Sequence, residues 1–168
     1  MDATLTLVLG GARSGKSFHA EAIVTALPPP WRYVATAQAL DDEMRDRVRE
    51  HRARRAAGWE TVEAPLDVSH TLSEAGDRPV LVDCLTLWLS NLLLGGHDIG
   101  AATAALDAAL AARTAPTVLV ANEVGLGIVP DNALARAFRD AAGRLNQRLA
   151  ARADSVLFLV AGLPMRVK

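Results

Sequence analysis

The sequence contains very little cysteine and very little lysine. Its 168 residues include one cysteine, Cys84, which excludes an internal disulfide framework and is typical of a reducing compartment. We therefore expect a cytoplasmic protein without a signal peptide, because a strand-like run already begins at Thr4. Among 18 basic residues only Lys16 and Lys168 are lysine. An internal lysine in a chain this rich in arginine calls for a functional explanation.

A surplus of charge and a membrane-length apolar run are also missing. The formal net charge is −1, which argues against a nucleic-acid partner held by a broad basic face. The longest apolar run, "LTLWLSNLLLGG", is too short to span a bilayer. Half of the residues are apolar, enough for one core, so we expect a single domain over 1–168 with no membrane span.

Strand-length apolar runs alternate with longer segments of helical period. The expected strands are 4–10, 32–37, 79–85, 117–123 and 155–162, with a shorter edge strand at 59–64. The expected helices are 16–26, 41–57, 66–75, 86–94, 101–113 and 132–152. This alternation predicts an α/β fold of the P-loop NTPase type, with a mostly parallel sheet flanked by helices on both faces.

The first expected strand runs directly into "GGARSGKS", which matches the P-loop pattern G-x-x-x-x-G-K-[ST] in full. Backbone amides of such a loop bind phosphates, Lys16 can reach the β and γ oxygens, and the Ser17 hydroxyl can ligate Mg²⁺. The motif therefore predicts binding of a nucleoside triphosphate. Its residues are Gly10, Gly11, Ala12, Arg13, Ser14, Gly15, Lys16 and Ser17.

Two acidic residues follow other expected strands. Asp83 ends a buried strand, where P-loop proteins keep a second carboxylate that supports Mg²⁺. Alternatively, Asp83 caps the next helix. Glu123 ends another strand, and ligands of open parallel sheets lie beyond the carboxyl ends of the strands. We therefore expect Asp83, Glu123 and the P-loop to share one edge of the sheet.

A histidine and four neighbouring arginines occupy "REHRARR". In a helix over 41–57, His51 and Arg55 continue an apolar stripe and would face the body of the protein. The stripe begins with Leu40, Met44 and Val48. Neutral imidazole is a competent nucleophile towards phosphorus, and nearby arginines disfavour its protonated form. From the residues alone, His51 is a covalent nucleophile, a general base, a phosphate ligand or a histidine on a solvated helix.

Five segments stand in a characteristic order: "GGARSGKS", "YVATAQALDDEM", "RVREHRARR" with "WETVE", "VLVDCLTLWLSNLL" and "NEVGLGIVPDNALARAFRDAAGRLNQRLA". In this order they resemble the bifunctional adenosylcobinamide kinase/adenosylcobinamide-phosphate guanylyltransferase family of cobalamin biosynthesis, from about Leu5 to Lys168. The resemblance implies that the chain phosphorylates adenosylcobinamide with ATP or GTP. It also implies transfer of GMP from GTP to adenosylcobinamide phosphate through a guanylylated histidine, which corresponds to His51. The family is a trimer.

The resemblance also implies which residues contact nucleotide. Besides the P-loop, they correspond to Ala35, Thr36, Ala37, Arg52, Ala53, Arg54, Arg55, Glu63 and Asp83. At Asp83 the two lines of reasoning differ, because the residues suggest a Mg²⁺ carboxylate and the family pattern suggests a guanine-nucleotide contact. The sequence is therefore compatible with both roles of Asp83.

Two other functions fit parts of the sequence. A kinase for a small metabolite or nucleoside monophosphate would need only the P-loop and an arginine-rich closing segment, for which Arg49–Arg55 qualify. A nucleotide-dependent switch or motor subunit would also carry a P-loop, but this chain shows no additional domain for a partner. A nucleotide adduct formed on addition of GTP separates the first alternative from the bifunctional enzyme.

Overall fold

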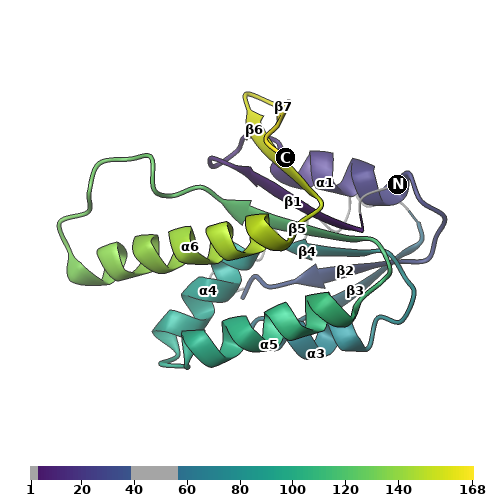
Figure 1. Ribbon diagram of the computed structural model, residues 1–168, viewed down its shortest axis with the longest axis horizontal. Helices are drawn as coiled ribbons and strands as arrows, with labels where there is room; N and C mark the ends of the chain where they lie inside the picture. Colours follow the sequence, from purple (N-terminus) through teal and green to yellow (C-terminus); the bar gives the residue numbers. More distant parts are fainter. Residues whose placement is uncertain (1–3, 39–56) are drawn as a thin grey trace.

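The computed structural model describes residues 4–38 and 57–168, and within them a central sheet carries helices on both faces (Figure 1). The strands are β1 (Leu5–Gly10), β2 (Trp31–Ala35), β3 (Trp59–Glu63), β4 (Val80–Asp83), β5 (Thr117–Asn122), β6 (Ser155–Val160) and β7 (Leu163–Arg166). The helices are α1 (Lys16–Thr25), α3 (Val68–Ser73), α4 (Leu85–Leu94), α5 (Ile99–Ala112) and α6 (Ala133–Arg152). Of the helix expected at 41–57, residues 41–56 lie outside the described residues, and Ala57 is in a turn.

The order of the strands in the sheet is β3-β2-β4-β5-β1-β6-β7. All neighbouring pairs are parallel except β6 and β7, which form an antiparallel hairpin. The prediction of a mostly parallel P-loop type of α/β fold is confirmed, and so is the edge position of β3. Because the β1, β4 and β5 strands are neighbours, the segments that follow their carboxyl ends meet at one edge of the sheet.

The strands are buried on both faces, which explains why their sequences scarcely alternate. Successive residues of β5 belong to different cores: Leu119 packs with α3 to α6, whereas Val118 and Val120 pack with α1. The first core is the larger and contains Trp88 from α4, which is 1% exposed. Among the described helices, α1 therefore covers one face of the sheet and the other four cover the opposite face (Figure 1).

Helix boundaries follow from capping side chains. Asp98 accepts a hydrogen bond from the amide of Ala101 at the start of α5, and Asn132 accepts one from Ala135 at the start of α6. The α6 helix then buries Ala141, and Leu145 and Leu149 one turn apart. None of the helices within the described residues is both long and apolar enough to cross a membrane.

Several expected boundaries were wrong. The β7 strand was missed altogether, and β2 and β4 end two residues before the expected positions. The helix expected at 66–75 is the six-residue α3, while α4 and α5 begin one and two residues early. The alternative role of Asp83 as a helix cap is also wrong, because Cys84 occupies the N-cap of α4 without a side-chain cap bond.

Candidate nucleotide-binding site

The P-loop connects the end of β1 to the start of α1, and its glycines are required by geometry. A Cβ atom on Gly10 would lie 2.7 Å from both the Leu159 carbonyl oxygen and the Ser14 hydroxyl. Gly15 is the N-cap of α1 and has a φ of +92°, which L side chains rarely adopt. Gly15 also accepts the first helical hydrogen bond, from the His19 amide at 3.0 Å. The last amides of the loop therefore lie at the N-terminus of α1, a position that favours bound anions.

The Lys16 side chain lies across this loop. Its ammonium donates to the Gly11 carbonyl oxygen and lies 3.4 Å from the Ser14 hydroxyl. Only 7% of Lys16 is exposed, and burial lowers its pKa, while the charges of Cys84 and Asp83 oppose that shift. A cation placed between the second and fifth residues of the loop can neutralise phosphate oxygens bound there.

Asp83 is the last residue of β4, and its carboxylate has a defined partner. The Tyr33 hydroxyl donates to Asp83 Oδ2 at 2.8 Å. Tyr33 belongs to β2, is 3% exposed and packs its ring edge-on against Trp59 of β3, with ring centroids 5.6 Å apart. The phenol therefore fixes one carboxylate oxygen of Asp83, whose charge acts on Lys16.

The backbone of Cys84, the residue after Asp83, is held at both its carbonyl and its amide. The Thr36 hydroxyl donates to the Cys84 carbonyl oxygen at 2.6 Å and accepts from the Cys84 amide at 2.8 Å. Asn91 of α4 donates to the Thr36 carbonyl oxygen at 2.9 Å. Burial, and secondarily the charge of Asp83, raise the pKa of the Cys84 thiol to about 11. Thr36 is fully buried, so its observed role is to connect β2 to the start of α4.

Glu123 lies where the sequence predicted it, directly after β5. Its amide donates to the Gly10 carbonyl oxygen at 3.1 Å, and its carboxylate accepts from the Gly125 amide at 2.7 Å. In the paired strands Gly10 is opposite Asn122. Glu123 and the P-loop therefore do share one edge of the sheet, and Asp83 reaches the same edge from the neighbouring β4.

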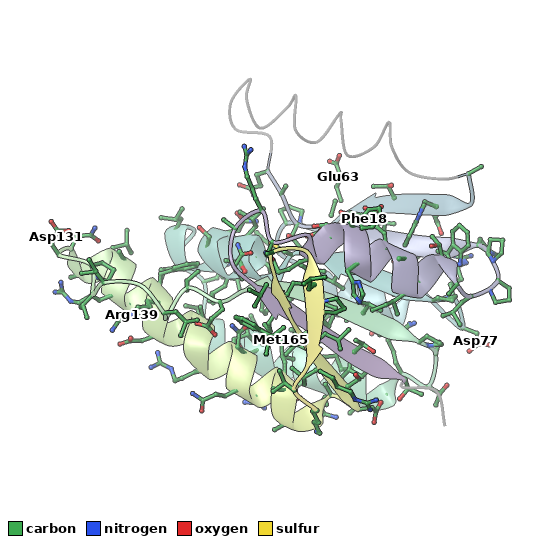
Figure 2. The ribbon with its side chains drawn as sticks, turned by 90° about the horizontal axis from the view of Figure 1, so that it is seen from above. Phe18, Glu63, Asp77, Asp131, Arg139 and Met165 are labelled. Carbon is green, nitrogen blue, oxygen red and sulfur yellow. The ribbon has the colours of Figure 1, made fainter. Side chains whose placement is uncertain are left out.

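The register of the sheet brings further sequence-predicted residues to this edge. Ala35 is opposite Asp83 on one side and opposite Glu63 on the other, so the ends of β2, β3 and β4 are level. Ala37 follows Thr36 and is partly buried, while Glu63 is exposed (Figure 2). Whether these residues contact nucleotide stays a prediction. His51, Arg52, Ala53, Arg54 and Arg55 lie outside the described residues.

The donor set at this edge fits a Mg²⁺ ion shared with phosphates. Within residues 4–38 and 57–168, no three His, Cys, Asp or Glu side chains are grouped so that they could hold a metal ion by themselves. Ser17 and Asp83 offer oxygen ligands, which Mg²⁺ prefers, and Mg²⁺ commonly takes one or two protein ligands and completes its shell with phosphates and waters.

Sequence reasoning missed two residues that hold the site in place. One is Tyr33, whose only signal was a phenol within a strand-like run. The other is Gly162, in the turn between β6 and β7, whose amide donates to the Ser14 carbonyl oxygen at 3.0 Å. Its signal was a glycine at the end of an apolar run, because glycine often marks a turn.

Comparison with known structures concerns the fold alone, because the identities are low. The flagellar accessory protein FlaH from Methanocaldococcus jannaschii is 10% identical, with a TM-score of 0.54 over 98% of this chain and 78% of that chain. An ATPase from the type III secretion system of pathogenic bacteria is 11% identical, with a TM-score of 0.56 over 97% of this chain and 56% of that chain.

Comparison with known sequences is far more specific. The bifunctional adenosylcobalamin biosynthesis protein CobU of Salmonella typhimurium is 47% identical, over 98% of this chain and 99% of its own length. The corresponding CobP of Pseudomonas aeruginosa is 50% identical, over 96% of each chain. A family model described as cobinamide kinase / cobinamide phosphate guanyltransferase matches residues 6–167. This chain therefore belongs to the cobinamide kinase / cobinamide phosphate guanyltransferase family of enzymes.

Proposed function

We propose that this enzyme first phosphorylates adenosylcobinamide with ATP or GTP, and then transfers GMP from GTP to the product. The products of the second step are adenosylcobinamide-GDP and pyrophosphate. The observation that carries this proposal is a complete P-loop, with a buried lysine across it, in a chain that matches the family over nearly its whole length. The substrates named here are adenosylcobinamide and adenosylcobinamide phosphate.

The kinase step rests on the described part of the site. The amides of Gly15, Lys16 and Ser17 would bind the triphosphate, and the Lys16 ammonium would move from its loop acceptors to the β and γ oxygens. Ser17 and Asp83 would hold a Mg²⁺ ion, which would supply neutralisation of phosphate charge. The corrinoid hydroxyl would attack the γ-phosphorus and lose its proton to water, the bond to the β–γ bridging oxygen would break, and the nucleoside diphosphate would leave.

The transferase step rests on the chemistry of "REHRARR". A neutral His51 nitrogen would attack the α-phosphorus of GTP, with pyrophosphate as the leaving group, and form a phosphorus–nitrogen bond. A phosphate oxygen of adenosylcobinamide phosphate would then attack the same phosphorus and release the imidazole. Arg52, Arg54 and Arg55 would stabilise the charge that develops on the phosphate.

Asp83 has two proposed roles that differ in their chemistry. As a Mg²⁺ ligand it would act in both steps, whereas as a guanine contact it would accept hydrogen bonds from the base and favour GTP over ATP. The bond from Tyr33 holds Oδ2, and either role would use this same carboxylate. The position of Asp83 beside Lys16 supports the metal role, because both groups would then face the same phosphates.

Assembly and location are further parts of the proposal. By family membership we propose a homotrimer acting in the cytoplasm, in keeping with a chain that has one cysteine. The alternative function, a P-loop kinase for another small metabolite without the transferase step, would leave the "REHRARR" arginines as a phosphate-closing segment only. Formation of adenosylcobinamide-GDP separates the two functions.

The chain offers a matched pair of variants for the test, because it has only two lysines. Lys16→Ala should abolish phosphorylation of adenosylcobinamide, since it removes the cation that lies across the P-loop. Lys168→Ala, at the other end of the chain, should keep near-normal turnover. Products are separated by chromatography after incubation with GTP and Mg²⁺. Near-normal kinase turnover by folded Lys16→Ala, or no corrinoid product from the unchanged enzyme, would contradict the proposed function.

A further inference from the structure

The hairpin of β6 and β7 lies against the P-loop, although it is distant in the sequence (Figure 2). The Gly162 amide donates to the Ser14 carbonyl oxygen at 3.0 Å, although the two residues are 148 positions apart in the sequence. A Cβ atom on Gly15 would lie 3.4 Å from the Gly162 Cα atom. Just before the turn, the Leu159 carbonyl oxygen lies so close to Gly10 that it excludes a side chain there. The turn therefore contacts the middle of the loop.

The turn is built to hold one shape. Val160 and Leu163 are paired across it, so it contains only Ala161 and Gly162. Both have positive φ, +51° and +81°, which is the pattern of the tight type I′ hairpin turn. Ala161 adopts this conformation although it costs an L residue on the order of 1 kcal/mol. In such a turn the amide of the second residue is not used by the hairpin itself, and here it bonds to Ser14.

The rest of β7 does not account for the hairpin by packing. All four residues of β7 are exposed, including Leu163 at 70% and Met165 at 56% (Figure 2). None of them belongs to either core. The β7 strand pairs with β6 and completes the turn that reaches Ser14.

A hydrogen bond to the Ser14 carbonyl also orients the Gly15 amide. The Ser14–Gly15 peptide is not among the cis bonds of the described residues, so its C=O and N–H point in opposite directions. With the carbonyl fixed on the hairpin side, the Gly15 N–H is directed to the side away from the hairpin. The other peptide of Gly15 is fixed by the helical bond to His19. Both peptide planes at Gly15 are thus set from outside a loop whose glycines would otherwise sample many conformations.

We propose that the Ala161–Gly162 turn positions the phosphate-binding loop: the Gly162 amide holds the Ser14 carbonyl and thereby directs the Gly15 N–H at the bound phosphate. Gly162 is a positioning residue, because it acts through the Ser14–Gly15 peptide. The inference rests on the proposed function, in which the loop amides bind the triphosphate. It adds a second, sequence-distant element to the binding site.

The test removes the N–H of residue 162 and keeps every side chain. Replacing Gly162 by glycolic acid turns the peptide bond into an ester, which keeps the turn geometry and has no N–H. We expect the dissociation constant for GTP with Mg²⁺ to rise about five- to tenfold, the scale of one lost hydrogen bond. A role in stability alone would lower the melting temperature and leave that constant within twofold of the unmodified protein. The matched control is an ester at Val167, beyond the other end of β7, which removes the amide that donates to the Val156 carbonyl oxygen at 2.8 Å. It should leave the dissociation constant for GTP within twofold.

A second measurement needs no altered protein. In NMR spectra of protein labelled with ¹⁵N-glycine, the Gly162 amide should be protected from hydrogen exchange. The amide resonance of Gly15 should shift when GTP binds. Equal GTP affinity of the ester protein, or a Gly162 amide that exchanges as in an unfolded chain, would overturn the positioning role alone. Failure of the unmodified protein to bind GTP would overturn the proposed function instead.

Discussion

The hydroxyl of Tyr33 donates to the carboxylate of Asp83 at 2.8 Å, and this bond links the β2 and β4 strands at the edge that carries the P-loop. Asp83 lies close enough to Lys16 to oppose the fall in the lysine pKa that burial causes. The phenol therefore holds a carboxylate whose negative charge acts on the Lys16 ammonium.

Tyr33→Phe should weaken catalysis without disturbing the fold. The phenylalanine ring can keep the packing against Trp59, but Asp83 loses a hydrogen bond to a charged acceptor, and we expect turnover in the kinase step to fall about 10-fold. The concentration of Mg²⁺ needed for half-maximal rate should rise if Asp83 is a metal ligand. A collapse of the preference for GTP over ATP would assign Asp83 to guanine. Unchanged turnover with unchanged Mg²⁺ and nucleotide dependence would show that the Tyr33 bond is only structural.

Cys84 should be chemically inert in the folded protein. Burial and the neighbouring Asp83 charge raise the pKa of its thiol to about 11, and only the thiolate reacts with disulfide reagents. At about pH 8 the reaction with a chromogenic disulfide reagent should be at least ~100-fold slower in native protein than in concentrated urea. The single cysteine makes the assay unambiguous. Rapid labelling of native protein would contradict the burial and charge described for this site.

Asp154 should make the free energy of unfolding fall as the pH becomes acidic. Its carboxylate accepts hydrogen bonds from the Thr4 amide, the Thr4 hydroxyl and the Leu5 amide, and the hydroxyl bond is the main cause of its lowered pKa. Because the folded pKa lies below the unfolded value of about 3.9, this stabilisation is complete above that value and is lost as pH falls through the folded pKa.

Asp154→Asn should therefore lower the free energy of unfolding near neutral pH by about 1 kcal/mol or less, since solvent screens this exposed group. The difference from the unchanged protein should shrink below about pH 4. Urea titrations over a range of pH measure both effects, and Asp131→Asn in the exposed loop before α6 serves as control (Figure 2). A difference that stays constant down to strongly acid pH would be inconsistent with the linkage.

The sequence predicted the elements that carry strong local signals. The P-loop was identified because glycine, lysine and serine stand at fixed spacings between a strand and a helix. The shared edge of Asp83 and Glu123 followed from a general property of parallel sheets. The β3 strand was placed at the edge because "WETVE" alternates, and it has β2 as its neighbour.

Long-range contacts left no such signal. The β7 strand is four residues long, contains Pro164 and does not alternate in polarity, so its pairing with β6 depends on tertiary context. Thr36 was assigned by resemblance to a nucleotide contact, but its hydroxyl is used by the backbone of Cys84, 48 residues later in the chain. The Gly162 bond to Ser14 depends on which strand lies beside β1, and the spacing of residues does not encode that order.

The most direct test of the whole account is the intact mass of the protein after incubation with GTP and Mg²⁺. We predict a gain of one GMP with release of pyrophosphate, in an adduct that is labile in acid and stable in base, as expected for a phosphorus–nitrogen bond at imidazole. His51→Ala should form no adduct yet keep kinase activity, whereas replacing His19, His70 or His97 should leave the adduct intact. No gain in mass, or an adduct that persists in His51→Ala, would contradict the proposed transfer through His51.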